Sequence, residues 1–463
     1  MTGFRLWEHW ATYAPDDIAL VAAEQSWTWA QVAHEIDSLQ STLRCSGLTP
    51  GQVICLKGRA ERKLVFAYLA CLSFGVIPAI IAEQPEQQLA IKFDSLYLPD
   101  ENAWLWDCQD ASDNRLDSGP ISLARGHALT LPAPSKIENI ASIIFTSGST
   151  GHPKAVVHSV AQHLASTRGL LEKFRFVKGD SWLLSLPMYH VSGLAIVWRW
   201  LSVGATLTIA SGDFASDIAG VSHASLVATQ LKRIVDNGWP TELKRVLLGG
   251  SHIPRALMTS AREHNIETWL GYGMTETAST VTAKRVDDIP SSGRVLPGRK
   301  VKLLGSHILV AGDTLAKGYY WQGELKPIVL THGWFDTKDL GEWVGEELRV
   351  IGRADNLFIS GGENVHCEEV EAALNALPNL SQSIVVAVED EEFGARCVAV
   401  VQSDQTPKVA EMNLALTSSL AKFKCPVAYF LMPESLSQSG IKVSRAQVKK
   451  WLASHQSNYV VIS

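Results

Sequence analysis

The stretch FTSGSTGHPK, at positions 145–154, has a composition suited to binding phosphate. Its two glycines can adopt positive φ and let the backbone approach a ligand closely, so that successive N–H groups surround an anion. The hydroxyl side chains add donors and the lysine adds a positive charge. A flexible Ser/Gly linker is the alternative, but a linker would not normally follow an apolar run or end in Pro-Lys. The predicted phosphate-binding residues are Thr146, Ser147, Gly148, Ser149, Thr150, Gly151 and Lys154.

Three common motifs of nucleotide-binding and hydrolytic enzymes do not occur in the chain. The loop does not fit GxxxxGK[ST], and the sequence contains neither GxGxxG nor GxSxG. These patterns are typical of P-loop kinases, dinucleotide-binding dehydrogenases and α/β-hydrolases, respectively. Those three classes therefore lose their main support.

The segments that would position the loop alternate between helix-like and strand-like patterns. Helices are expected at residues 29–43 and 161–174 and after Pro254, and strands at residues 52–56, 181–186, 205–209 and 245–248. Such alternation is typical of α/β layers with largely parallel strand pairing.

The pattern changes in the last third of the chain. Short strands that look antiparallel are expected at residues 300–304, 307–310, 341–344 and 348–351. A small α+β unit follows, with helices at residues 367–374, near 411–422 and at 444–452, and strands at 383–388 and 397–401. The sequence therefore predicts an α/β fold with a large N-terminal domain of mixed sheets, residues 1–353, and a small C-terminal α+β domain, residues 354–463.

Residues 64–82 carry no charge and are nearly long enough to span a bilayer. Gly75 and Pro78 interrupt the stretch, and a single broken span without a charge bias in its flanking loops is poor membrane topology. We therefore expect a buried helix to about Phe74, a stop at Gly75 and a buried strand after it.

Charge and cysteine content constrain partners and location. The chain has 41 Lys and Arg residues against 47 Asp and Glu residues and no basic block, which argues against general nucleic-acid binding. Its seven cysteines are odd in number, widely spaced and without CxxC, which is typical of reduced cytoplasmic thiols rather than disulfides or structural zinc. The N-terminal stretch is charged where a signal peptide needs an apolar run. A cytoplasmic protein without a membrane span is therefore expected.

TSGSTGHPK resembles the phosphate loop of the adenylate-forming superfamily, which contains acyl-CoA synthetases, nonribosomal adenylation domains and beetle luciferases. Further stretches resemble motifs of this family in the family's order: GYGMTE at 271–276, WFDTKDLG at 334–341, GRAD at 352–355, ISGGENVHCEEVE at 359–371 and SGIKVSR at 439–445. The resemblance runs from about residue 27 to residue 453. Two departures occur, because Lys338 stands where the family usually has glycine and Ile441 precedes Lys442.

The resemblance implies an ATP site built from these motifs. Tyr272 would pack on adenine, Thr275 would contact phosphate, and Glu276 would hold Mg²⁺. Asp339 would accept both ribose hydroxyls, and Arg353 would contact the ribose or a phosphate. The other residues expected to bind ATP or AMP are Gly249, Gly250, Ser251, Gly271 and Gly273.

The resemblance also implies a division of labour between two steps. Lys442 would supply the charge at the α-phosphorus, with Thr275 and Glu276 as the other catalytic residues. Asp355 would be the hinge about which a mobile C-terminal domain turns between adenylation and thioester formation. The tunnel for coenzyme A would be lined by Ser360, Gly361 and Gly362.

The stretches LPMYHVSGL and IVWRWL, at residues 186–194 and 196–201, resemble those of o-succinylbenzoate–CoA ligases, a family of menaquinone biosynthesis. An aromatic dicarboxylate would need an apolar slot and donors for the carboxylate that is not activated. Packing is an equal alternative for His190 and the favoured expectation for Trp198 and Trp200. The candidate acyl-binding residues are His190, Ser192, Gly193 and Thr280, together with positions 249–251.

The implied reaction joins o-succinylbenzoate to coenzyme A with ATP and Mg²⁺, through an acyl-adenylate, and releases AMP and pyrophosphate. Another aryl- or acyl-CoA ligase of the superfamily is the main alternative. A nucleotide-binding module without catalysis is a third alternative, which the intact motif residues argue against. Small molecules are the expected partners, nucleic acid is not, and self-association is left open.

Overall fold

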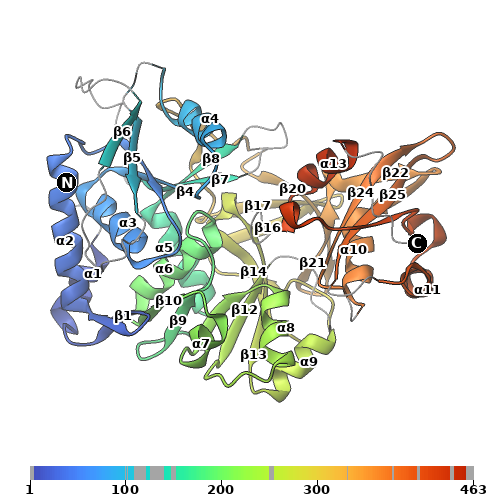
Figure 1. The fold of residues 1–463 in the computed structure, drawn as a ribbon, viewed down its shortest axis with the longest axis horizontal. Coiled ribbons are helices and arrows are strands. Elements are labelled where there is room, and N and C mark those ends of the chain that lie inside the picture. Colours follow the sequence, from blue (N-terminus) through green and yellow to red (C-terminus); the bar gives the residue numbers. More distant parts are fainter. Residues whose placement is uncertain are drawn as a thin grey trace.

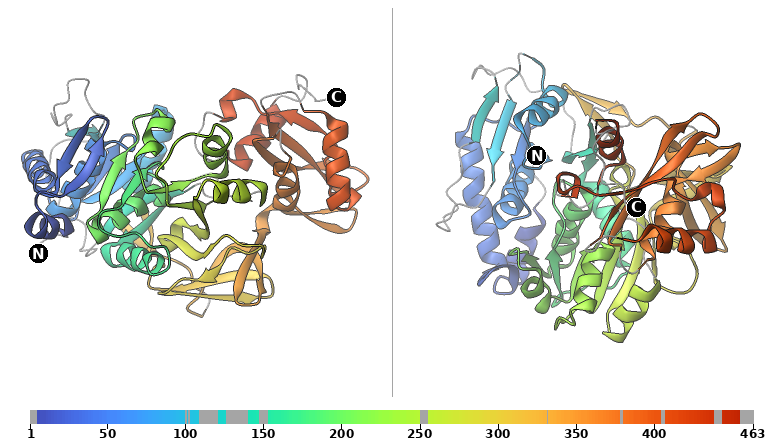
Figure 2. Two further views of the ribbon diagram at one scale, coloured as in Figure 1. Left: turned by 90° about the horizontal axis from the view of Figure 1, so that it is seen from below. Right: turned by 45° about the vertical axis from the view of Figure 1, so that its right-hand side comes forward.

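The computed structural model describes residues 5–99, 101, 103–108, 121–125, 140–146, 153–249, 255–330, 332–377, 380–403, 407–437 and 443–454. Figure 1 shows a large body with α1 (Leu6–Tyr13) at one end of the molecule and a smaller unit with α13 (Arg445–Ser454) at the other. The first view of Figure 2 shows the small unit standing beside the large body. The placing of the domain boundary between Arg353 and Ala354 stays a prediction.

Two large mixed sheets form the body. The strands of one follow the order β15-β14-β13-β12-β11-β9-β10-β1-β2, and those of the other follow β19-β18-β8-β7-β4-β3-β5-β6. The first comprises β1 (Ile18–Ala22), β2 (Gln25–Thr28), β9 (Ser181–Leu184), β10 (Thr206–Ile209), β11 (His223–Leu226), β12 (Arg245–Gly249), β13 (Glu267–Met274), β14 (Ser279–Arg285) and β15 (Arg294–Val295). The second comprises β3 (Val53–Lys57), β4 (Ile77–Ile81), β5 (Ala103–Asp107), β6 (Ile121–Arg125), β7 (Ile140–Thr146), β8 (Lys154–Ser159), β18 (Gly318–Trp321) and β19 (Glu324–Pro327).

Strand pairing is parallel in the middle of each sheet and antiparallel toward the edges. β10, β9, β11, β12 and β13 pair in parallel in the first sheet, as do β5, β3, β4 and β7 in the second. The pairs β13–β14, β14–β15 and β7–β8 are antiparallel. This architecture confirms the expected α/β class with mixed sheets.

Helices cover both faces of each sheet. The helices α3 (Arg62–Phe74), α5 (Val160–Leu171) and α6 (Val191–Val203) lie between the two sheets. The outer faces carry α4 (Glu86–Leu96) on one side and α8 (Ala228–Asp236) and α9 (Arg255–Glu263) on the other, and α2 (Trp29–Cys45) packs beside α3.

Alternation along the strands explains this layering. In β3, Ile54 and Leu56 enter the core between the sheets, whereas Val53 and Cys55 face the core under α4. Successive side chains of a strand point to opposite faces, so an uninterrupted apolar strand needs helices on both sides.

The charge-free stretch 64–82 folds as expected. α3 is buried on nearly all sides and ends at Gly75, which adopts φ +90°, and the buried strand β4 begins two residues later. A helix that is apolar all round belongs in a protein core when it is this short. Within the described ranges, no helix is both long and apolar enough to cross a membrane.

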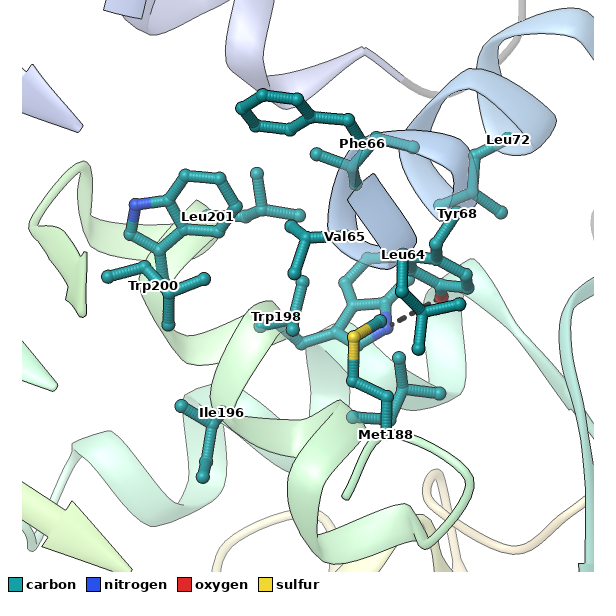
Figure 3. Close-up of a cluster of buried hydrophobic side chains, with 14 of the residues drawn as sticks. Leu64, Val65, Phe66, Tyr68, Leu72, Met188, Ile196, Trp198, Trp200 and Leu201 are labelled. Carbon is teal, nitrogen blue, oxygen red and sulfur yellow. Dashed lines mark hydrogen bonds between the residues drawn. The ribbon is translucent and has the colours of Figure 1, made fainter. Parts of the chain in front are cut away.

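Aromatic residues from α3 and α6 meet in the core between the sheets (Figure 3). The indole of Trp198 donates a hydrogen bond of 3.0 Å to the Tyr68 hydroxyl. Trp200 stacks on Trp29 with the ring centroids 5.0 Å apart and donates to the Ala19 carbonyl at 2.8 Å. The two tryptophans are therefore core residues, as favoured from the sequence.

A four-stranded antiparallel sheet links the body to the small unit. It is made of β16 (Arg299–Leu304), β17 (His307–Gly312), β20 (Phe335–Val344) and β21 (Glu347–Arg353). The chain then continues through the turn η2 (Ala354–Asn356) into the small unit.

The small unit has the α+β composition expected from the sequence. Its elements are the hairpin β22 (Leu357–Ser360) and β23 (Glu363–His366), the sheet β24 (Gln382–Asp390), β25 (Gly394–Gln402) and β26 (Tyr429–Leu431), and the helices α10 (Cys367–Asn375), α11 (Val409–Ser419) and α13. α10 and α11 pack on one face of the sheet, and α13 packs on the other.

Candidate active site

The C-terminal end of β13 brings together several residues expected to bind ATP. β13 pairs in parallel with β12, which places Gly249 opposite Gly271, and antiparallel with β14, which places Thr280 opposite Gly273. The 3₁₀ turn η1 (Thr275–Thr277) follows directly. Thr275 and Glu276, which the motif predicts to contact phosphate and Mg²⁺, therefore follow directly after the end of β13.

The two glycines of this motif let β14 return tightly against β13. A Cβ atom on Gly273 would collide with the Ser279 carbonyl, and one on Gly271 would lie 3.1 Å from Thr280 Cγ2. Larger residues would therefore push the strands apart beside the predicted ATP site.

Tyr272, Asp339 and Arg353 form a hydrogen-bonded chain across two sheets. The Tyr272 hydroxyl donates to Asp339 Oδ2 at 2.6 Å, and Arg353 Nη1 donates to Asp339 Oδ1 at 3.2 Å. Burial, and then the charge of Asp339, raises the pKa of Tyr272 well above its usual value, so the phenol remains a donor. An ionised carboxylate offers about four acceptor positions, so the bonds from Tyr272 and Arg353 are compatible with a further donor such as a ribose hydroxyl.

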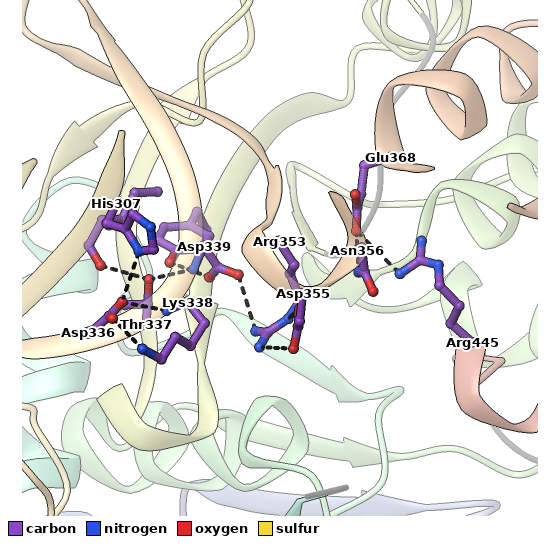
Figure 4. Close-up of polar contacts among 12 residues, drawn as sticks. His307, Asp336, Thr337, Lys338, Asp339, Arg353, Asp355, Asn356, Glu368 and Arg445 are labelled. Carbon is purple, nitrogen blue, oxygen red and sulfur yellow. Dashed lines mark hydrogen bonds and ion pairs between the residues drawn. The ribbon is translucent and has the colours of Figure 1, made fainter. Parts of the chain in front are cut away.

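Asp355 is tied to the same chain (Figure 4). Arg353 donates through Nε to Asp355 Oδ1 at 2.8 Å and through Nη2 to Oδ2 at 3.1 Å. These bidentate hydrogen bonds lower the pKa of Asp355, which therefore stays ionised. The predicted hinge residue thus touches a predicted nucleotide residue.

Glu276 and Lys154 meet at one tyrosine. Tyr319 donates from its hydroxyl to Glu276 Oε1 at 3.2 Å, and Lys154 Nζ lies 5.3 Å from the centroid of the Tyr319 ring. Thr146 and Lys154 are paired across β7 and β8, on the two sides of the predicted phosphate loop. Burial, followed by the charge of Glu276, raises the pKa of Tyr319 and keeps it protonated.

The carboxylate of Glu276 suits a magnesium ion. Its side chain is 8% exposed, and Oε2 accepts no hydrogen bond from the part of the chain that the structure describes. Mg²⁺ prefers hard oxygen ligands and usually takes one or two carboxylates together with substrate phosphates. Among the described residues there is no cluster of three metal-ligating side chains.

Three predicted acyl residues, His190, Ser192 and Gly193, lie at the start of α6, whereas Thr280 lies on β14. Gly193 packs so closely that a Cβ atom there would collide with the Leu186 and Pro187 carbonyls. His190 reaches the surface beside Tyr189, yet its surroundings desolvate the ring, and this effect, followed by the charge of Lys92, lowers its pKa. The ring is therefore neutral near pH 7.

Arg199 was not predicted as a site residue. It lies seven residues after Ser192, hence on the same face of α6, and is 3% exposed. Its guanidinium lies 4.9 Å from the Trp182 ring and 3.4 Å from Ser225 Oγ, and no described carboxylate pairs with it. Burial, followed by the charge of Arg299, lowers its pKa to about 9. An arginine inside the apolar run IVWRWL was the sequence signal.

The predicted coenzyme A segment lies in the small unit. Gly361 and Gly362, with φ of +56° and +88°, form the turn of the β22–β23 hairpin, and the Gly361 N–H donates to the Phe393 carbonyl at 2.9 Å. Ser360 is 2% exposed beside them. The remaining predicted site residues lie outside the described residues: Ser147, Gly148, Ser149, Thr150, Gly151, Gly250, Ser251 and Lys442.

Comparison with protein families agrees with this geometry. Residues 7–320 match the model of the AMP-binding enzyme family, and residues 369–440 match that of the AMP-binding enzyme C-terminal domain. The chain belongs to the AMP-binding enzyme family. The resemblance drawn from the motifs is therefore confirmed at the level of the family.

This AMP-binding enzyme is similar over its whole length to named ligases. It is 37% identical to a 2-succinylbenzoate–CoA ligase of Salmonella typhimurium strain LT2, over 98% of each chain. It is 38% identical to a 2-succinylbenzoate–CoA ligase of Escherichia coli strain K12, over 97% of this chain and 98% of that one. 2-Succinylbenzoate is the compound called o-succinylbenzoate above, so the finer resemblance is confirmed as well.

Solved structures give the same picture. A variant of E. coli MenE with bound OSB-AMS superimposes on this AMP-binding enzyme with a TM-score of 0.85, at 35% identity and over 98% of each chain. MenE from Bacillus subtilis in complex with ATP and magnesium ion shares the fold, with a TM-score of 0.78 over 92% of this chain and 95% of that one, at 24% identity.

Proposed function

We propose that the protein is an AMP-forming acid–thiol ligase that joins 2-succinylbenzoate to coenzyme A. The observation that carries the proposal is the convergence of Tyr272, Thr275, Glu276 and Asp339 at one strand end, in a chain similar over its whole length to 2-succinylbenzoate–CoA ligases.

The reaction divides into two balanced transfers. In the first, a carboxylate oxygen of the acid bonds to the α-phosphorus of ATP, the bond from that phosphorus to the bridging oxygen breaks, and pyrophosphate leaves. In the second, the sulfur of coenzyme A loses its proton to solvent and bonds to the acyl carbon, the bond from that carbon to the phosphate oxygen breaks, and AMP leaves. The phosphoryl step needs positioning and charge stabilisation more than covalent participation by the protein.

The chain's own residues supply that positioning. Asp339 would accept the ribose hydroxyls while Tyr272 fixes the carboxylate from the other side. Lys154 would hold the leaving pyrophosphate, and Thr275 would donate to a phosphate oxygen. Mg²⁺, when bound, would neutralise charge on the phosphate oxygens, and Glu276 would hold it.

Two further features are part of this proposal. Lys442 would act at the α-phosphorus, and the unit formed by residues 354–463 would turn about Asp355 between the two transfers. The chain passes into that unit at η2, which supports a hinge there. We also propose the cytoplasm as its location, since all seven cysteines are free thiols.

Arg199 supports a dicarboxylate as the acid. A buried guanidinium without an acidic partner is costly, and a substrate carboxylate would satisfy it. Arg199→Met should raise the KM for 2-succinylbenzoate roughly 10- to 100-fold, because a hydrogen bond between charged groups is lost. The KM for ATP should change little, and the melting temperature should not fall, because the unpaired buried charge is removed.

Steady-state kinetics with 2-succinylbenzoate and a monocarboxylate analogue check this role. Arg199→Met should change the KM for the monocarboxylate analogue little. Arg199→Lys should retain part of the preference for 2-succinylbenzoate over this analogue. An equal loss with both acids would contradict the assignment.

Release of AMP in the presence of coenzyme A, measured over a panel of carboxylic acids, tests the proposed function itself. 2-Succinylbenzoate should have the highest kcat/KM. A preference for a fatty acid or 4-coumarate would favour another ligase of the family, and no pyrophosphate release with any acid would favour a binding module.

A further inference from the structure

Tyr319 touches two residues that the proposed function assigns to different tasks. It lies on β18, where it pairs with Val156 of β8, two residues beyond Lys154. Its hydroxyl donates to Glu276 Oε1, and its ring faces the Lys154 ammonium. None of the motifs identified in the sequence includes it.

The ring holds the lysine without neutralising it. An ammonium within about 6 Å of an aromatic centroid is attracted by the ring quadrupole, and its full positive charge remains available to a ligand. Lys154 is exposed and forms no ion pair with a carboxylate among the described residues. A carboxylate partner would compete with pyrophosphate for the same charge, whereas an aromatic ring does not.

The hydroxyl fixes the carboxylate without blocking it. Tyr319 occupies one position on Oε1 of Glu276, and the backbone holds Glu276 from the other end, because the Ala316 N–H donates to its carbonyl at 2.7 Å. Oε2 keeps its acceptor positions for a cation. Hydrogen bonds to a metal-binding carboxylate typically orient it, and their loss typically costs 10- to 100-fold in metal affinity.

We infer that Tyr319 is a positioning residue that sets the spacing between the cation for the leaving pyrophosphate, Lys154, and the carboxylate for the metal, Glu276. The inference rests on the proposed function. It assigns two separable effects to one side chain, since the hydroxyl acts on metal-dependent binding and the ring acts on ATP binding with or without metal.

Two substitutions separate these effects. Tyr319→Phe removes only the hydroxyl, and Tyr319→Leu removes the ring as well. Tyr320→Phe is the matched control, because Tyr320 is the next residue of the same strand, points to the other face and is buried at 3% exposure in the core under α4.

Calorimetric titration of ATP, with Mg²⁺ and with EDTA, measures binding independently of turnover. Tyr319→Phe should raise the Kd for ATP about tenfold in Mg²⁺ and less than twofold in EDTA. Tyr319→Leu should raise it in both buffers, and Tyr320→Phe in neither. Thioester formation from supplied acyl-adenylate should stay within about twofold of wild type for every variant, because that step uses neither the metal nor pyrophosphate.

Several outcomes would overturn the inference. One is an equal loss of ATP affinity by Tyr319→Phe in Mg²⁺ and in EDTA. Another is an equal loss of activity in adenylation and in thioester formation, which a purely structural role predicts. A Kd of Tyr319→Phe for ATP in Mg²⁺ that equals the wild-type value would also overturn the inference. The proposed function fails separately, if the wild-type protein releases no pyrophosphate with 2-succinylbenzoate.

Discussion

Lys338 departs from the family motif and adopts a backbone conformation that favours glycine. It occupies the position where the resemblance expects glycine, and it adopts φ +64° in the left-handed region. Its N–H and its ammonium both bond to Asp336, at 2.9 and 2.6 Å, while the Asp339 N–H donates to Thr337 Oγ1 at 3.0 Å (Figure 4). Two hydrogen bonds to Asp336 thus hold the turn, and Lys338 adopts a backbone conformation that favours glycine.

Lys338→Gly should therefore stabilise the protein. A non-glycine residue in this region costs roughly 1–2 kcal/mol, and the exposed pair with Asp336 returns only part of that. We expect the free energy of unfolding in urea to rise by about 0.5–1 kcal/mol. Lys338→Ala, which keeps the strain and loses the ion pair, is the control and should not stabilise. A loss of stability with glycine would contradict this explanation.

Single residues also show which contacts could not be predicted from the sequence. The GYGMTE motif identified Glu276, but Tyr319 lies 43 residues away along the chain and reaches it only through the pairing of β18 with β8. Arg199 was not singled out from the sequence, where it stands inside the apolar run IVWRWL. The contacts of Tyr319 with Glu276 and of Arg199 with Trp182 depend on tertiary structure, which local composition does not specify.

At the scale of elements, Arg445 joins α13 to α10 and β24. It donates to the Val385 carbonyl at 2.9 Å, to Glu371 Oε1 at 2.5 Å and to Glu368 Oε1 at 3.3 Å, and Asn356 of η2 donates to the same oxygen of Glu368 at 2.5 Å. Burial raises the pKa of Glu371, an effect that Arg445 opposes. Arg445 follows Lys442 by three residues, so the network links the turn that carries the predicted hinge to the segment that carries the predicted catalytic lysine.

Arg445→Met should therefore impair the step that uses Lys442. Displacing a catalytic group by about 1 Å can cost on the order of 100-fold, so we expect adenylation, measured by pyrophosphate release, to fall at least tenfold. Thioester formation from supplied acyl-adenylate should fall much less. Lys442→Ala should show the same pattern more strongly.

Lys450→Met, an exposed change on α13, is the control for Arg445→Met and should leave both half-reactions unchanged. Equal losses by Arg445→Met in the two half-reactions would instead mean that the network only stabilises the small unit.

Elements were also the level at which prediction from sequence worked best. α2, α3, α10, β16 and β17 were expected close to their observed bounds, because their apolar residues follow a helical or strand period without interruption. The pairing of β1 with β10 was not expected, since Leu20 and Leu207 are far apart in the chain and nothing local selects that neighbour. Parallel pairing is decided by the packing of the helices between strands.

At the scale of the whole molecule, three buried histidines should make the protein less stable at acid pH. His158 of β8 and His163 of α5 have ring centroids 5.1 Å apart, and the ring of His223 contacts those of Phe174, Phe176 and Trp182. Burial lowers the pKa of His158 and of His223 from 6.5 to about 4, and that of His163 well below 6.5. All three fold as neutral rings.

Stability should therefore fall as the pH drops below about 6.5. The unfolded chain binds protons at these histidines first, so the stabilisation is complete above pH 6.5 and is lost progressively toward pH 4. For His158 alone the loss would reach about 3 kcal/mol by pH 4. Urea unfolding between pH 7 and pH 5 measures it before most carboxylates titrate, and a constant free energy of unfolding across that range would contradict it.

Tryptophans, including the stacked pair Trp29 and Trp200, are distributed very unevenly between the large body and the small unit. Of 15 tryptophans, only Trp451 follows residue 353. Intrinsic fluorescence therefore reports almost entirely on the large body, whereas far-ultraviolet circular dichroism reports on both parts. Melting curves recorded by the two methods will coincide if the molecule unfolds as one cooperative unit and separate if the small unit melts on its own.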